Sequence, residues 1–107
     1  MPMINIEYDD GKVKDKEISD LSKAIQKIVS EKTKIEDVFV YANSAKIKFK
    51  IAPIEIFVQM SEHKIKNLDD LFNQVKSDLS AWKTKNKFNH PINLTIIPMK
   101  WKFDTNI

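Results

Sequence analysis

The sequence predicts an α+β protein in which two β-α-β units form one four-stranded sheet, with both helices on one face. Two stretches carry apolar residues at a 3.6-residue period, and each lies between short apolar runs typical of strands. The order strand, helix, strand therefore occurs twice, and Pro2 and Pro53 each stand directly before a strand. We expect a single domain over residues 1–107, built from the pseudo-repeat halves 1–52 and 53–107.

The first half begins with the run PMINIEY, whose Ile4, Ile6 and Tyr8 share one face of a strand. A turn follows at DDGK, which holds Gly11, the only glycine of the chain. Asp15 is a suitable cap for a helix that should end near Thr33. Its apolar stripe consists of Ile18, Leu21, Ile25, Ile28 and Val29.

Two further strands are predicted in the rest of this half. The run DVFVY is one, and AKIKFKI at residues 45–51 alternates apolar residues with Lys46, Lys48 and Lys50, as a half-exposed strand does. The intervening YANS is a plausible turn, so that residues 37–51 form a hairpin or one long bent strand.

The second half repeats the plan. IEIFVQM is a nearly continuous apolar run, typical of a strand that is covered on both faces. Asn67 is a good N-cap, and Lys83, Lys85 and Lys87 suit the C-terminal end of the helix dipole. The stripe of this helix consists of Leu68, Leu71, Phe72, Val75, Leu79 and Trp82. INLTII is the next strand, Pro98 interrupts its ladder, and MKWKF alternates as a terminal edge strand.

Two topologies satisfy this order of elements. Either two parallel β-α-β units lie side by side with both helices on one face, or the chain has the ferredoxin-like split β-α-β arrangement. The strand order distinguishes them, and the sequence does not give it.

Composition excludes several functional classes. The chain has no cysteine, its charge is +3, and all 18 of its basic residues are lysines. An anion would therefore be held by lysine point charges or backbone N–H groups. One glycine cannot build a phosphate loop or the RNP1 motif of RNA-binding domains, and His63 and His90 show no metal-ligand spacing. We expect a cytoplasmic protein without cofactor, metal, nucleic acid or membrane partner.

A Met-Pro start that leads straight into a strand, two β-α-β halves and this chain length resemble the tautomerase superfamily. That superfamily includes 4-oxalocrotonate tautomerase, 5-carboxymethyl-2-hydroxymuconate isomerase and macrophage migration inhibitory factor. The succession of PIEIFVQM, a helix and LTIIPMKWKF resembles a bacterial branch of the superfamily whose function is unknown. The resemblance implies a homotrimer with active sites near subunit boundaries and a catalytic N-terminal proline. The carboxylate-binding arginines common in the superfamily have no counterpart in this chain.

Pro2 is the candidate catalytic residue. Removal of Met1 would make it a free secondary amine, which an apolar pocket and nearby cations would keep neutral at working pH. Such a base could catalyse keto–enol tautomerisation of a small carboxylate-bearing substrate. Alternatively, Pro2 only leads a strand, and the protein is a non-catalytic trimeric binding or interaction module with the same fold.

Five residues are candidates for substrate binding. Lys46, Lys48, Lys50 and Lys100 could hold a carboxylate, although such alternating lysines also mark the solvated face of an edge strand. Glu55 lies within an apolar strand, either as a polar site residue or as a partner for a lysine.

Overall fold

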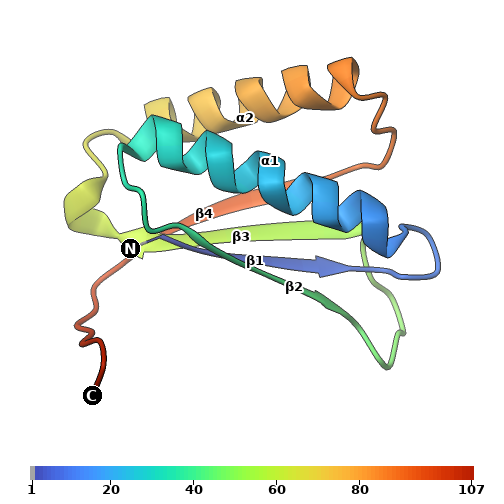
Figure 1. Cartoon of the computed structure of the whole chain (residues 1–107), viewed down its shortest axis with the longest axis horizontal. Helices are drawn as coiled ribbons and strands as arrows, with labels where there is room; N and C mark the ends of the chain where they lie inside the picture. The colour runs from blue at the N-terminus through green and yellow to red at the C-terminus, as the bar shows by residue number, and fades with distance from the viewer. Residues whose placement is uncertain (1) are drawn as a thin grey trace.

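The computed structural model describes residues 2–107 and contains a four-stranded sheet with two helices packed on one face (Figure 1). The strands and helices follow the predicted order. They are β1 (Met3–Tyr8), α1 (Asp15–Thr33), β2 (Phe39–Ser44), β3 (Ile54–Ser61), the 3₁₀ turn η1 (Glu62–Lys64), α2 (Leu68–Lys85) and β4 (Asn93–Met99).

The sheet order β2-β1-β3-β4 decides between the two topologies. β1 pairs in parallel with β2, β3 pairs in parallel with β4, and β1 and β3 are antiparallel at the centre. In a split β-α-β unit another strand would separate the two strands that a helix connects. Here the strands of each unit are direct neighbours, so the side-by-side arrangement is confirmed and the ferredoxin-like alternative is wrong.

The core lies between the helices and the sheet. Ile4 and Ile6 of β1 and Ile56 of β3 are fully buried, as are Leu21 and Ile25 of α1. Burying a side chain of this size contributes about 1.5–3 kcal/mol. The whole predicted stripe of α1 is buried, whereas only Val75 and Leu79 of the α2 stripe are.

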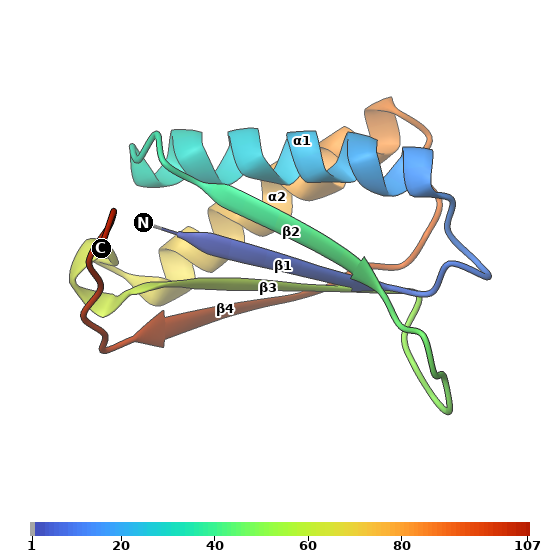
Figure 2. The ribbon, with the colours of Figure 1, turned by 60° about the horizontal axis from the view of Figure 1, so that its bottom comes forward.

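β3 is covered on one face only, which corrects the prediction made from its apolar run. Its burial alternates: Ile54, Ile56, Val58 and Met60 are buried under the helices, and the residues between them are half-buried. Phe57 belongs to the other face, which carries no helix (Figure 2). We call this uncovered side of the sheet the open face.

The helix starts were predicted to within one residue. α1 begins at Asp15, so the cap position belongs to Lys14, whose N–H donates to Glu17 Oε1 at 3.0 Å. Asp15 instead accepts a 2.7 Å hydrogen bond from the Tyr8 hydroxyl. Asn67 caps α2 as predicted, because its Oδ1 accepts from the Asp70 N–H at 3.0 Å.

Two predicted strands do not form. Residues 45–51 contain no strand and belong to a projecting connection between β2 and β3, so both the hairpin and the long bent strand predicted over 37–51 are wrong. The predicted turn YANS is instead the second part of β2. Of the run MKWKF, only Met99 is in a strand. Both segments alternate like strands, but neither has a neighbouring strand with which to form a ladder in a single chain. We call residues 45–53 the finger and residues 100–107 the tail.

Finger and tail leave the sheet at opposite ends, both on the side away from the helices (Figure 1). Within residues 2–107, neither helix combines the length and the apolar character needed to cross a membrane.

Candidate active site at the Pro2 end of the sheet

Pro2 is fully buried at the entrance of a central strand. Its side chain is less than 2% exposed, and its carbonyl oxygen accepts the Phe39 N–H at 3.2 Å. Met3 pairs with Phe39 and Gln59, so continuing the register sets Pro2 beside Val38 and opposite Met60. Because side chains alternate along a strand, Pro2 shares the helix-covered face with Ile4. The predicted removal of Met1 concerns a residue outside the described range.

Several chain segments meet at this end. β1 and β2 start here, β3 and β4 end here, α1 ends and α2 begins (Figure 1). The convergence follows from the topology, because the helix of each parallel unit carries the chain back to the end of the sheet at which the first strand of that unit or its antiparallel neighbour begins or ends. Polar residues at the ends of these elements therefore surround the entrance of β1.

A groove of about 540 Å³ lies at this end, between the end of α1 and the turn that leads into α2. Four lysines line it: Lys32, Lys34, Lys64 and Lys66. Lys32 is paired with Asp78 at 3.1 Å, whereas no carboxylate lies within ion-pair distance of the other three among residues 2–107. The remaining lining residues are Thr33, His63, Ile65, Asn67, Asp70, Leu71 and Gln74.

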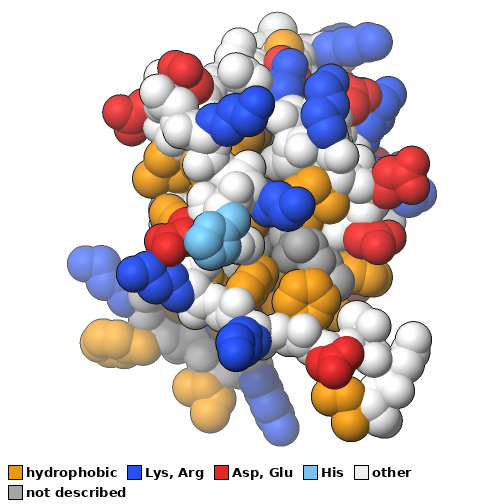
Figure 3. All heavy atoms as spheres, turned by 90° about the vertical axis from the view of Figure 1, so that its left-hand side faces the viewer, with side chains coloured by type: hydrophobic (Ala, Val, Ile, Leu, Met, Phe, Trp, Pro, Cys, Tyr) orange, Lys and Arg blue, Asp and Glu red, His pale blue; other side chains and the backbone are white. Residues whose placement is uncertain are grey.

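The groove is suited to anions. Figure 3 looks onto this end and shows lysine side chains near a histidine, with carboxylate groups and hydrophobic patches between them. Lysine ammonium groups act as flexible point charges, so they can hold a carboxylate without the fixed geometry of an arginine fork. We call this hollow the lysine groove.

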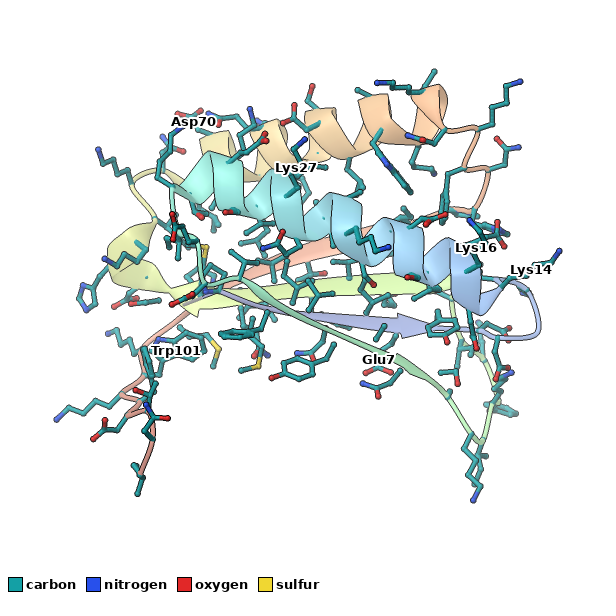
Figure 4. The ribbon with its side chains drawn as sticks, viewed as in Figure 1. Glu7, Lys14, Lys16, Lys27, Asp70 and Trp101 are labelled. Atoms are coloured by element: carbon teal, nitrogen blue, oxygen red, sulfur yellow. The ribbon has the colours of Figure 1, made fainter. Side chains whose placement is uncertain are left out.

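A second hollow, of about 430 Å³, lies between the end of β3 and the tail. Its lining consists of Ser61, Lys64, Trp101, Lys102 and Phe103. Lys64 lines both hollows, so the two share a wall. Figure 4 shows Asp70 and Trp101 at this same end of the molecule, and Lys14 and Lys16 at the other.

The predicted lysine row is placed far from Pro2. Lys46, Lys48 and Lys50 lie in the finger, beyond the end of β2, whereas Pro2 precedes the start of β1. Lys48 is bound within the chain: its Nζ lies 3.0 Å from Asp9 Oδ1 and also pairs with Asp10. Hydrogen bonding to Lys48 lowers the pKa of both aspartates, and the two carboxylates raise the pKa of Lys48.

Glu55 also lies at the end opposite Pro2. It stands at the start of β3 on the open face, directly across from Glu7. Its Oε1 accepts a 2.8 Å hydrogen bond from Asn93 Nδ2, so its partner is an amide and not a lysine. Lys100 follows β4 at the Pro2 end and is exposed. Of the five predicted binding residues, only Lys100 therefore lies at the same end as Pro2.

Sequence reasoning missed Lys34, Lys64 and Lys66. They carry no motif: Lys34 directly follows α1, Lys64 is the last residue of η1, and Lys66 lies in the short link between η1 and α2. The topology gathers these ends at one edge, which is the signal that could have identified them. Lys34 ends α1 in the left-handed conformation, with a φ of 60°.

The two histidines lie at opposite ends. His63 lines the lysine groove, whereas His90 Nε2 lies 2.8 Å from Glu17 Oε2 near the start of α1. The hydrogen bond from the Lys14 N–H, followed by that with His90, lowers the pKa of Glu17. Across residues 2–107, no three acidic or histidine side chains are grouped closely enough to hold a metal ion.

Comparison with known proteins gives similarity in structure only. No protein-family model matches the sequence, and no curated protein matches it either. Among solved structures, a domain of unknown function (DUF1904) from Sebaldella termitidis superposes with a TM-score of 0.69 at 9% identity, covering 100% of this chain and 98% of that one. A 5-carboxymethyl-2-hydroxymuconate delta-isomerase superposes with a TM-score of 0.66 at 12% identity, covering 100% of this chain and 88% of the isomerase.

A third solved structure, a fused 4-OT described as an asymmetric trimer, superposes with a TM-score of 0.64 at 11% identity. The match covers 91% of this chain and 85% of that one. These identities are low enough that the matches establish the fold alone. The chain thus belongs to the α+β class with a mixed four-stranded sheet. Within that class it has the tautomerase fold, and the resemblance predicted from the sequence is confirmed at this level.

Proposed function

We propose that this protein is a tautomerase that moves a proton between carbon and oxygen in a small, carboxylate-bearing keto or enol substrate. The nitrogen of Pro2, freed by removal of Met1, acts as the base. The observation that carries the proposal is the position of Pro2: it directly precedes a central strand of a tautomerase fold, at the end of the sheet that also holds the lysine groove.

The proposed roles follow from simple chemistry. The neutral proline nitrogen accepts a proton from the enol hydroxyl and returns one to the adjacent carbon, so the protein is unchanged after each turnover. Burial disfavours the charged form of an amine, which helps to keep Pro2 neutral. Lys34, Lys64 and Lys66, with Lys100 beyond β4, hold the carboxylate and offset charge that develops on oxygen.

A homotrimer is part of this proposal. A 4-OT protein with this fold is described as a trimer, and the open face of a single chain carries exposed aromatic residues. On that face Phe39 is 45% exposed and Tyr41 is 52% exposed. Such patches are typical of interfaces, and a domain of this size gains stability by association. The expected compartment is the cytoplasm.

The burial of Pro2 also favours a second candidate function. A proline that fills the core at the start of a strand has a structural role that needs no catalysis. On that account the protein is a binding or interaction module with a tautomerase fold, and the lysine groove binds an anion without turnover.

Two measurements test the proposal. Intact mass reports whether Met1 is removed, because an acylated proline nitrogen cannot act as a base. With Met1 absent, we expect wild-type protein to accelerate ketonisation of phenylenolpyruvate, followed by ultraviolet absorbance, and Pro2→Ala to lose at least ~10²-fold in kcat. Retained Met1, or equal rates in the two proteins, would leave the binding module as the surviving candidate.

The lysines are tested by a matched pair. Lys34→Ala should raise KM for the carboxylate substrate several-fold, while Lys46→Ala, in the finger, should leave KM unchanged. If the effects were reversed, the substrate carboxylate would be held by the finger and not by the lysine groove.

A further inference from the structure

A further groove, of about 600 Å³, lies on the helix side of the molecule. It is lined by α1 between Glu17 and Lys27, by Trp82 in the last turn of α2 and by the three residues that follow α2. The two helices run in opposite directions, so the start of α1 and the end of α2 lie at the same end, opposite Pro2 (Figure 1). Small-molecule sites typically have volumes of about 300–1,000 Å³. We call this hollow the helix groove.

Trp82 gives the helix groove an aromatic wall. Its ring packs against the core with its centroid 5.2 Å from that of Phe88, and the Phe88 ring meets the His90 ring edge-on at 5.2 Å. His90 Nε2 lies 2.8 Å from Glu17 Oε2, which ties the chain after α2 to α1. These contacts hold Trp82 in place. A fixed indole ring on the wall of a groove is a surface on which a planar ring stacks.

The two carboxylates of the helix groove already have partners. Glu17 accepts the Lys14 N–H at 3.0 Å and is bound to His90. Asp20 pairs with Lys16 through Oδ2 at 3.3 Å, and among the described residues no donor occupies its Oδ1. Asp20 can therefore accept a hydrogen bond from a ligand hydroxyl, and the paired acids leave the lysines of the groove to set its charge.

Three lysines of the helix groove have no such partner. Within residues 2–107, no carboxylate lies within ion-pair distance of Lys23, Lys27 or Lys87. Lys23 and Lys27 stand one turn apart on α1, where like charges repel, and Figure 4 shows Lys27 between the two helices. Three unpaired cations suit a group with two negative charges better than a single carboxylate.

Lys87 occupies a position at which glycine is usual. It follows α2 in the left-handed conformation, with a φ of 53°. The dipole of α2 favours a cation at this end of the helix, but it has no bearing on Lys23 and Lys27, which lie within α1. All three ammonium groups line the same groove, and a bound anion offsets their mutual repulsion.

We propose that the helix groove binds a nucleoside monophosphate. The base stacks on Trp82, the phosphate lies among Lys23, Lys27 and Lys87, and Asp20 accepts a hydrogen bond from a ribose hydroxyl. The three parts of such a ligand match the three kinds of group that line the groove. An aromatic carboxylate would leave part of the positive charge unmatched, and inorganic phosphate would leave Trp82 uncovered. The site lies at the end of the sheet opposite Pro2 and does not depend on the proposed tautomerase activity.

The first test uses the fluorescence of Trp82. The chain has two tryptophans, and the other, Trp101, lies in the tail at the opposite end, so Trp101→Phe makes Trp82 the only reporter. Adenosine 5′-monophosphate should quench this fluorescence to saturation, and adenosine should bind at least ~10-fold more weakly, because it lacks the charge that the three lysines hold. Raising NaCl from ~50 to ~500 mM should weaken binding of the monophosphate more than binding of adenosine.

The second test removes single lysines in the Trp101→Phe background. Lys87→Ala should weaken binding of adenosine monophosphate about threefold to fivefold and leave binding of adenosine unchanged. Lys34→Ala is the matched control, because Lys34 is also exposed, also follows a helix and also has a positive φ, but lines the lysine groove. It should bind the nucleotide as tightly as the background protein does. Lys27→Ala, in the middle of α1, should reproduce the effect of Lys87→Ala without changing a left-handed residue.

Several results would overturn the proposal. Equal affinity for adenosine and its monophosphate would show that the lysines hold no phosphate. A loss of binding in Lys34→Ala, with none in Lys27→Ala or Lys87→Ala, would move the nucleotide to the lysine groove. Tighter binding of indole-3-acetate than of adenosine monophosphate would replace the phosphate by a carboxylate. Absence of saturable quenching up to ~10 mM nucleotide would mean that the groove binds no nucleotide of this kind. None of these results bears on turnover at Pro2.

Discussion

Replacing Pro2 by alanine should weaken the fold as well as abolish turnover. Pro2 is fully buried on the helix side of β1, and alanine removes two of its ring carbons. At about 0.8 kcal/mol for each buried methylene, the loss is about 1.6 kcal/mol. The unfolding entropy of a 107-residue domain is about 0.22 kcal/mol/K, so the midpoint should fall by roughly 7 °C.

Differential scanning calorimetry measures this fall, and Ile4→Val supplies the matched control. Ile4 is fully buried on the same face of β1, and this change typically costs about 0.5–1.5 kcal/mol. Both variants should unfold at lower temperature, but only Pro2→Ala should lose turnover at 25 °C. An unchanged midpoint for Pro2→Ala would refute the buried placement of Pro2, and an equal loss of turnover in Ile4→Val would show that stability and not chemistry limits the rate.

Three further predictions concern charged groups. The hydrogen bond from the Lys14 N–H, and then that with His90, lower the pKa of Glu17 in the folded protein. The resulting contribution to the free energy of unfolding is complete above the unfolded-state pKa of about 4.3, and it should be lost as the pH falls through the lower folded-state pKa. When urea unfolding is measured between pH 6 and pH 3, the free energy of unfolding should fall less with decreasing pH in Glu17→Gln than in wild type. An equal fall in the two proteins would contradict the role of Glu17. Lys48→Met should speed backbone amide exchange in the finger without changing that of α1, because only the base contacts of the finger are lost. In wild type the same release should appear as acid protonates the two aspartates, and protection that persists at low pH would argue against this anchor. Lys34→Ala should weaken inhibition by a small dicarboxylate more than Lys46→Ala does, and equal inhibition constants would remove the lysine groove from the site.

The sequence predicted the elements that bury apolar residues and failed for the alternating segments that have no neighbouring strand in the sheet. The α1 stripe and the cap at Asn67 were correct because local spacing and capping chemistry determine them. Residues 45–51 alternate as regularly as any strand, but a ladder needs a neighbouring strand, which a single chain does not provide. The strand order was equally out of reach, because both topologies bury the same residues.

The residues of the candidate site also divide into those that the sequence indicated and those that only the structure brings together. Pro2 was proposed because it follows Met1 directly and leads into a strand, and its role stays a prediction. Lys34, Lys64 and Lys66 were missed because they are scattered in sequence and meet only through the topology. Lys46 and Lys50 were favoured because their alternation is conspicuous, although the structure sets them at the opposite end of β1 from Pro2. The regular alternation of residues 45–51 thus did not indicate the groove, which is assembled from the ends of elements.

The most direct test of the central claim is covalent labelling with 2-oxo-3-pentynoate. A free, neutral amine adds to the alkyne carbon remote from the ketone, a proton moves to the neighbouring carbon, and the protein gains the mass of one reagent molecule with nothing released. In protein that lacks Met1, we predict one adduct per chain, mapped by peptide mass spectrometry to Pro2, with turnover lost in proportion. An unmodified Pro2 with adducts spread over the lysines would contradict the account.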